Sequence, residues 1–178
     1  MRDIFIGMLF IFLNFHITLG TMQIGLIPAF VGYYFMLKGL SELSDFSQRF
    51  ITIKPFVIGM IIYSLFFYVV DLFGGSVNID ILLIMALALV HLAISLYISY
   101  SIIMGIKDIE LAQQRELNST QLYLIWKIQA VVLLITHAAF IVPVLAIAGV
   151  VIALVTTVIY LFAFNKAKNL FYEGGSQE

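Results

Sequence analysis

The sequence predicts an all-α protein embedded in a membrane: a polytopic helical bundle of six transmembrane helices with both termini in the cytoplasm. The first observation is composition, because 63% of the residues are hydrophobic and only 11% are charged, whereas a soluble domain is about half apolar and about a quarter charged. The second is that the apolar residues form runs of about 20, long enough for a helix to cross a ~30 Å hydrocarbon layer. The third is the placement of the basic residues.

The run at residues 24–43 shows the pattern most clearly. It contains no charged residue before Lys38. Pro28 falls in the first turn of the expected helix, where its missing N–H costs no hydrogen bond. A stripe of glycines at every seventh position gives this helix a smooth face, against which another helix can pack closely in lipid. The stripe consists of Gly25, Gly32 and Gly39.

Five further apolar runs complete the expected set of spans. The first, at residues 4–19, is the shortest, at about 24 Å as a helix. If it lies in the interface instead of crossing, five spans remain. The other four are expected at residues 55–73, 79–106, 120–141 and 145–164, separated by Gly, Pro, Ser and Asn residues that favour turns and helix caps. The prediction is one transmembrane domain at 1–165, followed by a polar cytoplasmic tail at 166–178.

The basic residues predict the orientation. With the N-terminus inside, eight of the nine fall at inner ends of spans, and Lys127, two turns into the fifth span, can reach the same side. An excess of Lys and Arg on the cytoplasmic side is typical of multi-pass proteins, here of a bacterial plasma membrane. The nine are Arg2, Lys38, Arg49, Lys54, Lys107, Arg115, Lys127, Lys166 and Lys168.

Composition and missing motifs exclude several function classes. The chain has no cysteine, which removes disulfides, thiolate catalysis and sulfur-ligated metals. The net charge of −1 gives no reason to expect nucleic acid. The sequence lacks a phosphate-binding glycine loop and the common hydrolase motifs, so we expect no cofactor and no enzymatic activity. His91 and Ser95 lie one turn apart like a base and a nucleophile, but ordinary helix packing explains that spacing better.

Polar residues inside the spans give the candidate binding site, because they are costly in lipid and normally face the bundle or a cavity. Most lie in the outer part of their spans, with His91 near the middle. We expect them to line an outward-facing pocket for a small polar or cationic solute, with a metal held by His16, Asp71 and His137 as an alternative, and simple hydrogen bonds between helices as another. The candidate ligand-binding residues are Asn14, His16, Tyr68, Asp71, His91 and His137.

Two resemblances bear on the class of protein. The segment G-L-I-P-A-F-V-G-Y-Y at residues 25–34 looks like uncharacterised small polytopic membrane proteins of Gram-positive bacteria, a resemblance that implies no function. The size, the six spans and the two inner termini resemble the substrate-binding subunits of energy-coupling-factor transporters in architecture only. Those subunits carry small residues on the first span for docking, where this chain has only Gly7.

Two functions therefore stay open. The first is a small-solute binding or transport subunit with an outward-facing polar pocket. The alternative is a non-catalytic accessory or assembly subunit that holds a membrane or cytoplasmic partner through an exposed face of small residues. Besides the glycine stripe, Gly149 and Ala153 on the last span are candidates for helix packing.

Overall fold

The structure is a computed structural model that describes residues 1–12, 16–19, 22–25, 28–73, 81–138 and 143–173. This part of the chain contains six helices and one pair of strands. In order they are α1 (Arg2–Phe12), β1 (His16–Leu19), β2 (Met22–Gly25), α2 (Ala29–Glu42), α3 (Gln48–Leu72), α4 (Ile81–Gln113), α5 (Ser119–Ala138) and α6 (Pro143–Glu173).

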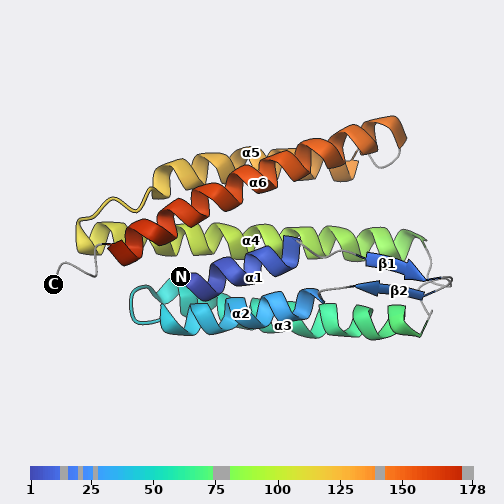
Figure 1. Ribbon diagram of the computed structural model, residues 1–178, viewed down its shortest axis with the longest axis horizontal. Helices are drawn as coiled ribbons and strands as arrows, with labels where there is room; N and C mark the ends of the chain where they lie inside the picture. Colours follow the sequence, from blue (N-terminus) through green and yellow to red (C-terminus); the bar gives the residue numbers. More distant parts are fainter. Residues whose placement is uncertain (13–15, 20–21, 26–27, 74–80, 139–142, 174–178) are drawn as a thin grey trace. The chain divides into compact units, whose positions relative to one another are not determined.

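The chain divides into two compact units, residues 1–98 and 99–178, and the boundary falls inside α4. In the first unit, α1 packs against α2, α2 packs against α3, and β2 also touches α3. In the second unit, α5 and α6 run side by side (Figure 1). Each unit is therefore a set of neighbouring helices in sequence order.

Four of the described helices are long and apolar enough to cross a membrane. They contain the segments Gln48–Val70, Met85–Gln113, Ser119–Ala138 and Ile147–Glu173. The helices α1 and α2 have only 11 and 14 residues, fewer than the ~20 that a helical crossing needs. By length and composition, the chain is a membrane-embedded helical protein.

The expected first span is wrong as a single helix over residues 4–19. The helix α1 ends at Phe12, and His16–Leu19 forms strand β1, which pairs antiparallel with β2 so that His16 lies opposite Gly25. The sequence H-I-T-L alternates polar and apolar residues and includes two β-branched side chains, a pattern that favours a strand. The second expected span changes too, because α2 begins only at Ala29. Gly25 consequently lies in a strand and not on a helical stripe.

Glycines set the contact between α1 and α2. A Cβ atom added to Gly7 would lie 2.5 Å from the carbonyl oxygen of Gly32, and one added to Gly32 would lie 2.7 Å from the carbonyl oxygen of Gly7. One added to Gly39 would lie 2.7 Å from the backbone nitrogen of Ile4. The two backbones therefore touch directly, which is how small residues promote helix association in lipid.

The third helix begins earlier than the expected span at residues 55–73. It starts at Gln48 and carries Pro55 in its interior, although proline removes one backbone hydrogen bond from a helix. Side chains on both sides of the proline keep the helix continuous, because they recur at intervals of three and four and lie buried on one face. These side chains are Phe50, Ile53, Val57 and Met60.

In the second unit, α5 and α6 meet through small and polar residues. A Cβ atom added to Gly149 would lie 2.8 Å from the Thr136 hydroxyl oxygen, so the two helices approach closely at this point. Further along, the Gln129 side-chain amide donates a hydrogen bond of 3.1 Å to the Thr157 hydroxyl, and both side chains are buried. The contact between α5 and α6, called the polar seam below, thus combines close packing at Gly149 with an interhelical hydrogen bond.

At one end of the second unit, side chains form hydrogen bonds with groups at the ends of the helices. The Glu110 carboxylate accepts hydrogen bonds from the Leu117 backbone N–H, at 2.8 Å, and from the Ser119 hydroxyl at the start of α5. The Arg115 guanidinium donates to the Leu170 carbonyl in the last turn of α6, at 3.0 Å. A carboxylate at a helix N-terminus and a cation at a C-terminus both complement the helix dipole. Residues 166–173, expected as part of a polar tail, continue α6 as helix.

In the first unit, an ion pair joins the start of α1 to the last part of α2. The Lys38 ammonium lies 2.9 Å from the Asp3 carboxylate, whose side chain is only 4% exposed, and Arg2 lies 3.7 Å from the same group. The hydrogen bond from Lys38 holds the pKa of Asp3 below its usual value, although burial opposes this shift. The start of α1 and the end of α2 therefore lie together.

Candidate functional site

Half of the predicted ligand-binding residues fall where the structure describes no side chain. Asn14 lies outside the described residues. His16 is in strand β1 and Asp71 is in the last turn of α3, but their side chains lie outside the description. The proposed metal set of His16, Asp71 and His137 is therefore untested at two of its three positions.

The other three residues have described surroundings. The ring of Tyr68 packs edge-on against Phe30, with centroids 5.7 Å apart. His137 lies in the other unit, and its Nδ1 bonds to the Leu133 carbonyl of its own helix at 2.9 Å. His91 lines a cavity.

His91 and Ser95, which are spaced like a base and a nucleophile, have different contacts in the structure. The Ser95 hydroxyl lies 3.5 Å from the hydroxyl of Tyr33, a buried residue of α2. His91 instead stacks at an angle of 31° on Tyr63, with ring centroids 5.5 Å apart. Within the described ranges, no group of three His, Cys, Asp or Glu side chains is placed to hold a metal ion.

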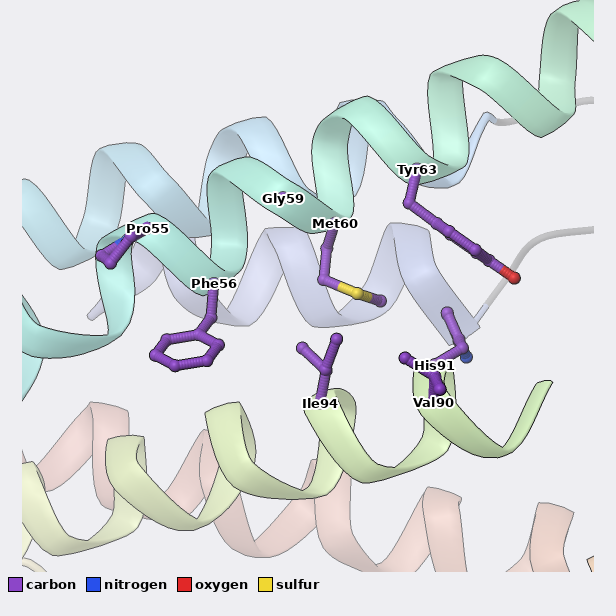
Figure 2. A pocket seen from close by; sticks show the side chains of 8 residues that line it. All are labelled: Pro55, Phe56, Gly59, Met60, Tyr63, Val90, His91 and Ile94. Atoms are coloured by element: carbon purple, nitrogen blue, oxygen red, sulfur yellow. The ribbon is translucent and has the colours of Figure 1, made fainter. Parts of the chain in front are cut away.

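The cavity next to His91 is a groove between α3 and α4, both parts lying in the first unit. It has a volume of about 250 Å³. Figure 2 shows Pro55 and Phe56 at one end, Met60 and Ile94 facing each other in the middle, and Tyr63 and His91 at the other end. The eight lining residues are Pro55, Phe56, Gly59, Met60, Tyr63, Val90, His91 and Ile94.

Helical spacing explains why these residues line one groove. Pro55, Gly59 and Tyr63 follow one another at intervals of four along α3, so they lie on one face of the helix. Val90 and Ile94 have the same spacing on α4. The groove thus lies between one face of α3 and one face of α4. On α3 its lining runs from Pro55 to Tyr63.

Gly59 gives the groove its depth. A Cβ atom added there would meet nothing within 4 Å, and the residue is exposed. This segment of α3 belongs to a helix able to cross a membrane. The groove is therefore open at Gly59, on a helix that is long and apolar enough to cross a membrane.

The two ends of the groove differ in polarity. Around Phe56 the lining is apolar, and its ring packs edge-on against Tyr97 with centroids 4.9 Å apart. At the opposite end, Tyr63 contributes a hydroxyl and His91 an imidazole. None of the eight lining residues is a carboxylate, an ammonium or a guanidinium. This arrangement suits a molecule with an apolar body and one small polar group.

The sequence analysis missed two residues of the groove, Gly59 and Tyr63, although their spacing indicates a shared helix face. Gly59 and Tyr63 share the four-residue spacing with Pro55, and a proline, a glycine and a tyrosine on one face of a span indicate an indented surface with a polar tip. The signal shows the face but not its partner. That α4 lies opposite this face is known only from the structure.

The class that the fold and groove define is a membrane-embedded helical protein with a groove between two spans. Comparison with protein-family models, with curated proteins and with solved structures finds no match to the chain.

Proposed function

We propose that the chain is a six-span protein of the bacterial plasma membrane, with both termini in the cytoplasm, that binds a small molecule as the ligand-binding subunit of a transport system. The observation that carries the binding proposal is the α3–α4 groove, which is open, uncharged and about 250 Å³ in volume. Most ligand pockets are likewise apolar with a few placed polar groups. The groove lining shifts the expected ligand from a small polar solute to a molecule that is mostly apolar.

Segment lengths support six crossings. The helix α1 rises about 16 Å, and the four residues of β1 add about 13 Å, which together approach the ~30 Å hydrocarbon thickness. The helix α2 and strand β2 reach about 34 Å by the same reckoning. A strand edge in lipid needs protein cover, and β2 touches α3.

The placement of charge supports cytoplasmic termini. Arg2 and Lys38 meet at Asp3, at the shared end of α1 and α2. Arg115 binds the last turn of α6 near Lys166 and Lys168, at the shared end of α4, α5 and α6. In each unit, basic residues thus gather at one end of the described helices, and such ends are normally cytoplasmic.

The alternative of an accessory subunit depended on an exposed face of small residues. Gly32 and Gly39 instead face α1, with no room for a side chain. Since this face is already used within the chain, it offers nothing to a partner. We therefore place binding of a small molecule ahead of an assembly role, and binding ahead of catalysis because Ser95 is paired with Tyr33.

The binding proposal is tested by identifying what copurifies with the protein. Extracts of wild type, Gly59→Leu and Val69→Leu, all purified in mild detergent, are compared by mass spectrometry. Leucine at Gly59 fills open space in the groove, whereas Val69 is exposed on the same helix outside the groove lining. We expect one molecule to be retained by wild type and Val69→Leu and lost from Gly59→Leu. Equal retention by all three, or a stoichiometric partner protein in place of a small molecule, contradicts the proposal.

The orientation is tested separately. Because the chain has no cysteine, single cysteines at Ser44 and Ser76 can be labelled with a membrane-impermeant maleimide in intact cells. We expect Ser76→Cys to react from outside and Ser44→Cys to react only after lysis. The reverse result overturns the proposed topology.

A further inference from the structure

We infer that the ligand of the α3–α4 groove is a lipid quinone, that is, a neutral flat ring carrying carbonyl oxygens on an apolar tail. The inference rests on the proposed function, because it requires the groove to hold a ligand. It follows from four properties of the groove: its lack of charge, its depth in the membrane, its flat aromatic end and its polar tip.

The lining selects for a neutral molecule. The eight lining residues include no carboxylate, ammonium or guanidinium. An ionised group placed against hydrocarbon and apolar side chains is costly without an opposite charge. A fatty acid or a phospholipid head therefore finds no Lys or Arg in the lining, and a metal ion finds one imidazole and no carboxylate.

The polar end of the groove lies too far from the ends of the span to be a site for a lipid headgroup at the membrane surface. Tyr63 lies nine residues after Lys54 and eight before Asp71, which is about 12–13 Å of helix from either charge. A hydrocarbon core of ~30 Å places Tyr63 near its middle and the phospholipid headgroups at its edges. The polar partner of Tyr63 must accordingly belong to a molecule that can sit inside the hydrocarbon.

The polar end of the groove is built from two rings. Tyr63 and His91 have centroids 5.5 Å apart with an interplanar angle of 31°, and both line the cavity (Figure 2). Aromatic faces pack well against other flat rings in offset or edge arrangements. A ligand with a planar head therefore finds a better match at this end than one with only an alkyl chain.

The Tyr63 hydroxyl supplies the specific contact. Within the described residues, no hydrogen bond of this hydroxyl is found, and a hydroxyl left unbonded in an apolar medium costs free energy. A carbonyl oxygen on the ring of the ligand would accept a hydrogen bond from it. From Tyr63 back to Pro55, the groove then offers about 12 Å of apolar wall for the tail, with Met60 and Ile94 on its two sides.

The test compares two probes with the same tail. One is a benzoquinone with a decyl chain, and the other is decylbenzene, which lacks the carbonyls. Each is titrated into protein held in phosphatidylcholine nanodiscs, and an apparent Kd is taken from the rise in the thermal unfolding midpoint. The variants are Tyr63→Phe, which removes only the hydroxyl, Tyr34→Phe as the matched control at an exposed tyrosine outside the groove lining, and Gly59→Leu, which fills the groove.

We expect the quinone to bind Tyr63→Phe about tenfold more weakly than wild type, because one hydrogen bond is lost, and to bind Tyr34→Phe as wild type does. Decylbenzene should not distinguish Tyr63→Phe from wild type. Gly59→Leu should bind neither probe. Equal quinone affinity in wild type and Tyr63→Phe overturns the quinone assignment, while loss of binding in Gly59→Leu still supports the groove as a ligand site. If Gly59→Leu binds both probes like wild type, the proposed function falls as well.

Discussion

The contact between α1 and α2 and the groove between α3 and α4 use glycine in opposite ways. At Gly7, Gly32 and Gly39 an added methyl group would collide with backbone atoms, whereas at Gly59 it would meet nothing within 4 Å. In lipid, a glycine can thus either bring two backbones into contact or leave an indentation in a helix surface. Only the first use stabilises the fold, and only the second leaves room for a ligand.

The largest effect should come from placing a large side chain in the closed contact. In Gly32→Leu the new side chain meets the backbone of α1, which cannot yield as a flexible side chain would, so we expect a loss of about 3 kcal/mol or more, or failure to accumulate. Unfolding in detergent measures the loss. Gly59→Leu is the matched control and should unfold like wild type. Equal destabilisation of the two variants would remove the distinction between contact and groove.

A smaller effect is expected at the polar seam between α5 and α6. Gln129→Leu removes the donor to Thr157 and leaves a buried hydroxyl without its partner, at a cost of about 1–2 kcal/mol. Thr157→Val in the same chain should recover part of that loss, because both polar groups are then absent. Gln121→Leu, at an exposed position of α5, is the control. A loss in the double variant equal to the sum of the two single losses would show that the bond contributes nothing.

The ion pair at Asp3 should give a pH-dependent effect of modest size. Because Lys38 depresses the pKa of Asp3, the stability from the ionised carboxylate is present above the ordinary value of 3.8 and is lost as the pH falls through the lower folded value.

Thermal unfolding of wild type and Asp3→Asn across an acid titration measures this effect. The two midpoints should differ at neutral pH and converge below pH 3.8. Asp45→Asn, at an exposed position, provides the control for the removal of one carboxylate. A constant gap for Asp3→Asn would mean that its charge does not contribute.

The smallest effect is expected at the groove itself. Gly59→Ala adds a methyl group to open space and should change stability by less than about 0.5 kcal/mol. The same change at Gly39 would put a methyl 2.7 Å from the backbone nitrogen of Ile4 and should cost at least about 1 kcal/mol. Paired unfolding measurements compare the two. Similar losses at both positions would show that α3 and α4 close over Gly59.

The sequence predicted the membrane class and the four long helices well, because hydrophobic runs report directly on transfer into lipid. The expected helix was wrong at residues 16–19, where the overall hydropathy is high but polar and apolar residues alternate. Hydropathy measures how apolar a segment is and carries no information on whether it is helix or strand. The start of α3 was also misplaced, because the predicted span begins at Pro55. The helix begins at Gln48, and Phe50 and Ile53 lie buried before the proline.

The candidate site was less predictable than the fold. Of the six polar residues chosen from the sequence, the structure brings His91 into the groove, while Tyr68 packs on Phe30 and His137 binds its own helix. Polarity alone selects residues that need a partner, but a partner can be a neighbouring ring or carbonyl. Which face of α3 meets α4 depends on packing over the whole unit, and no local pattern encodes it.

The state of Gly59 in the membrane tests the account most directly. Since the chain has no cysteine, Gly59→Cys can carry a nitroxide spin label, and its collisions with oxygen and with a water-soluble nickel complex can be compared in nanodiscs. The account predicts frequent collisions with oxygen, which concentrates in hydrocarbon, and few with nickel. A label that is immobile and shielded from both reagents, or one reached mainly by nickel, would contradict an open groove facing the lipid.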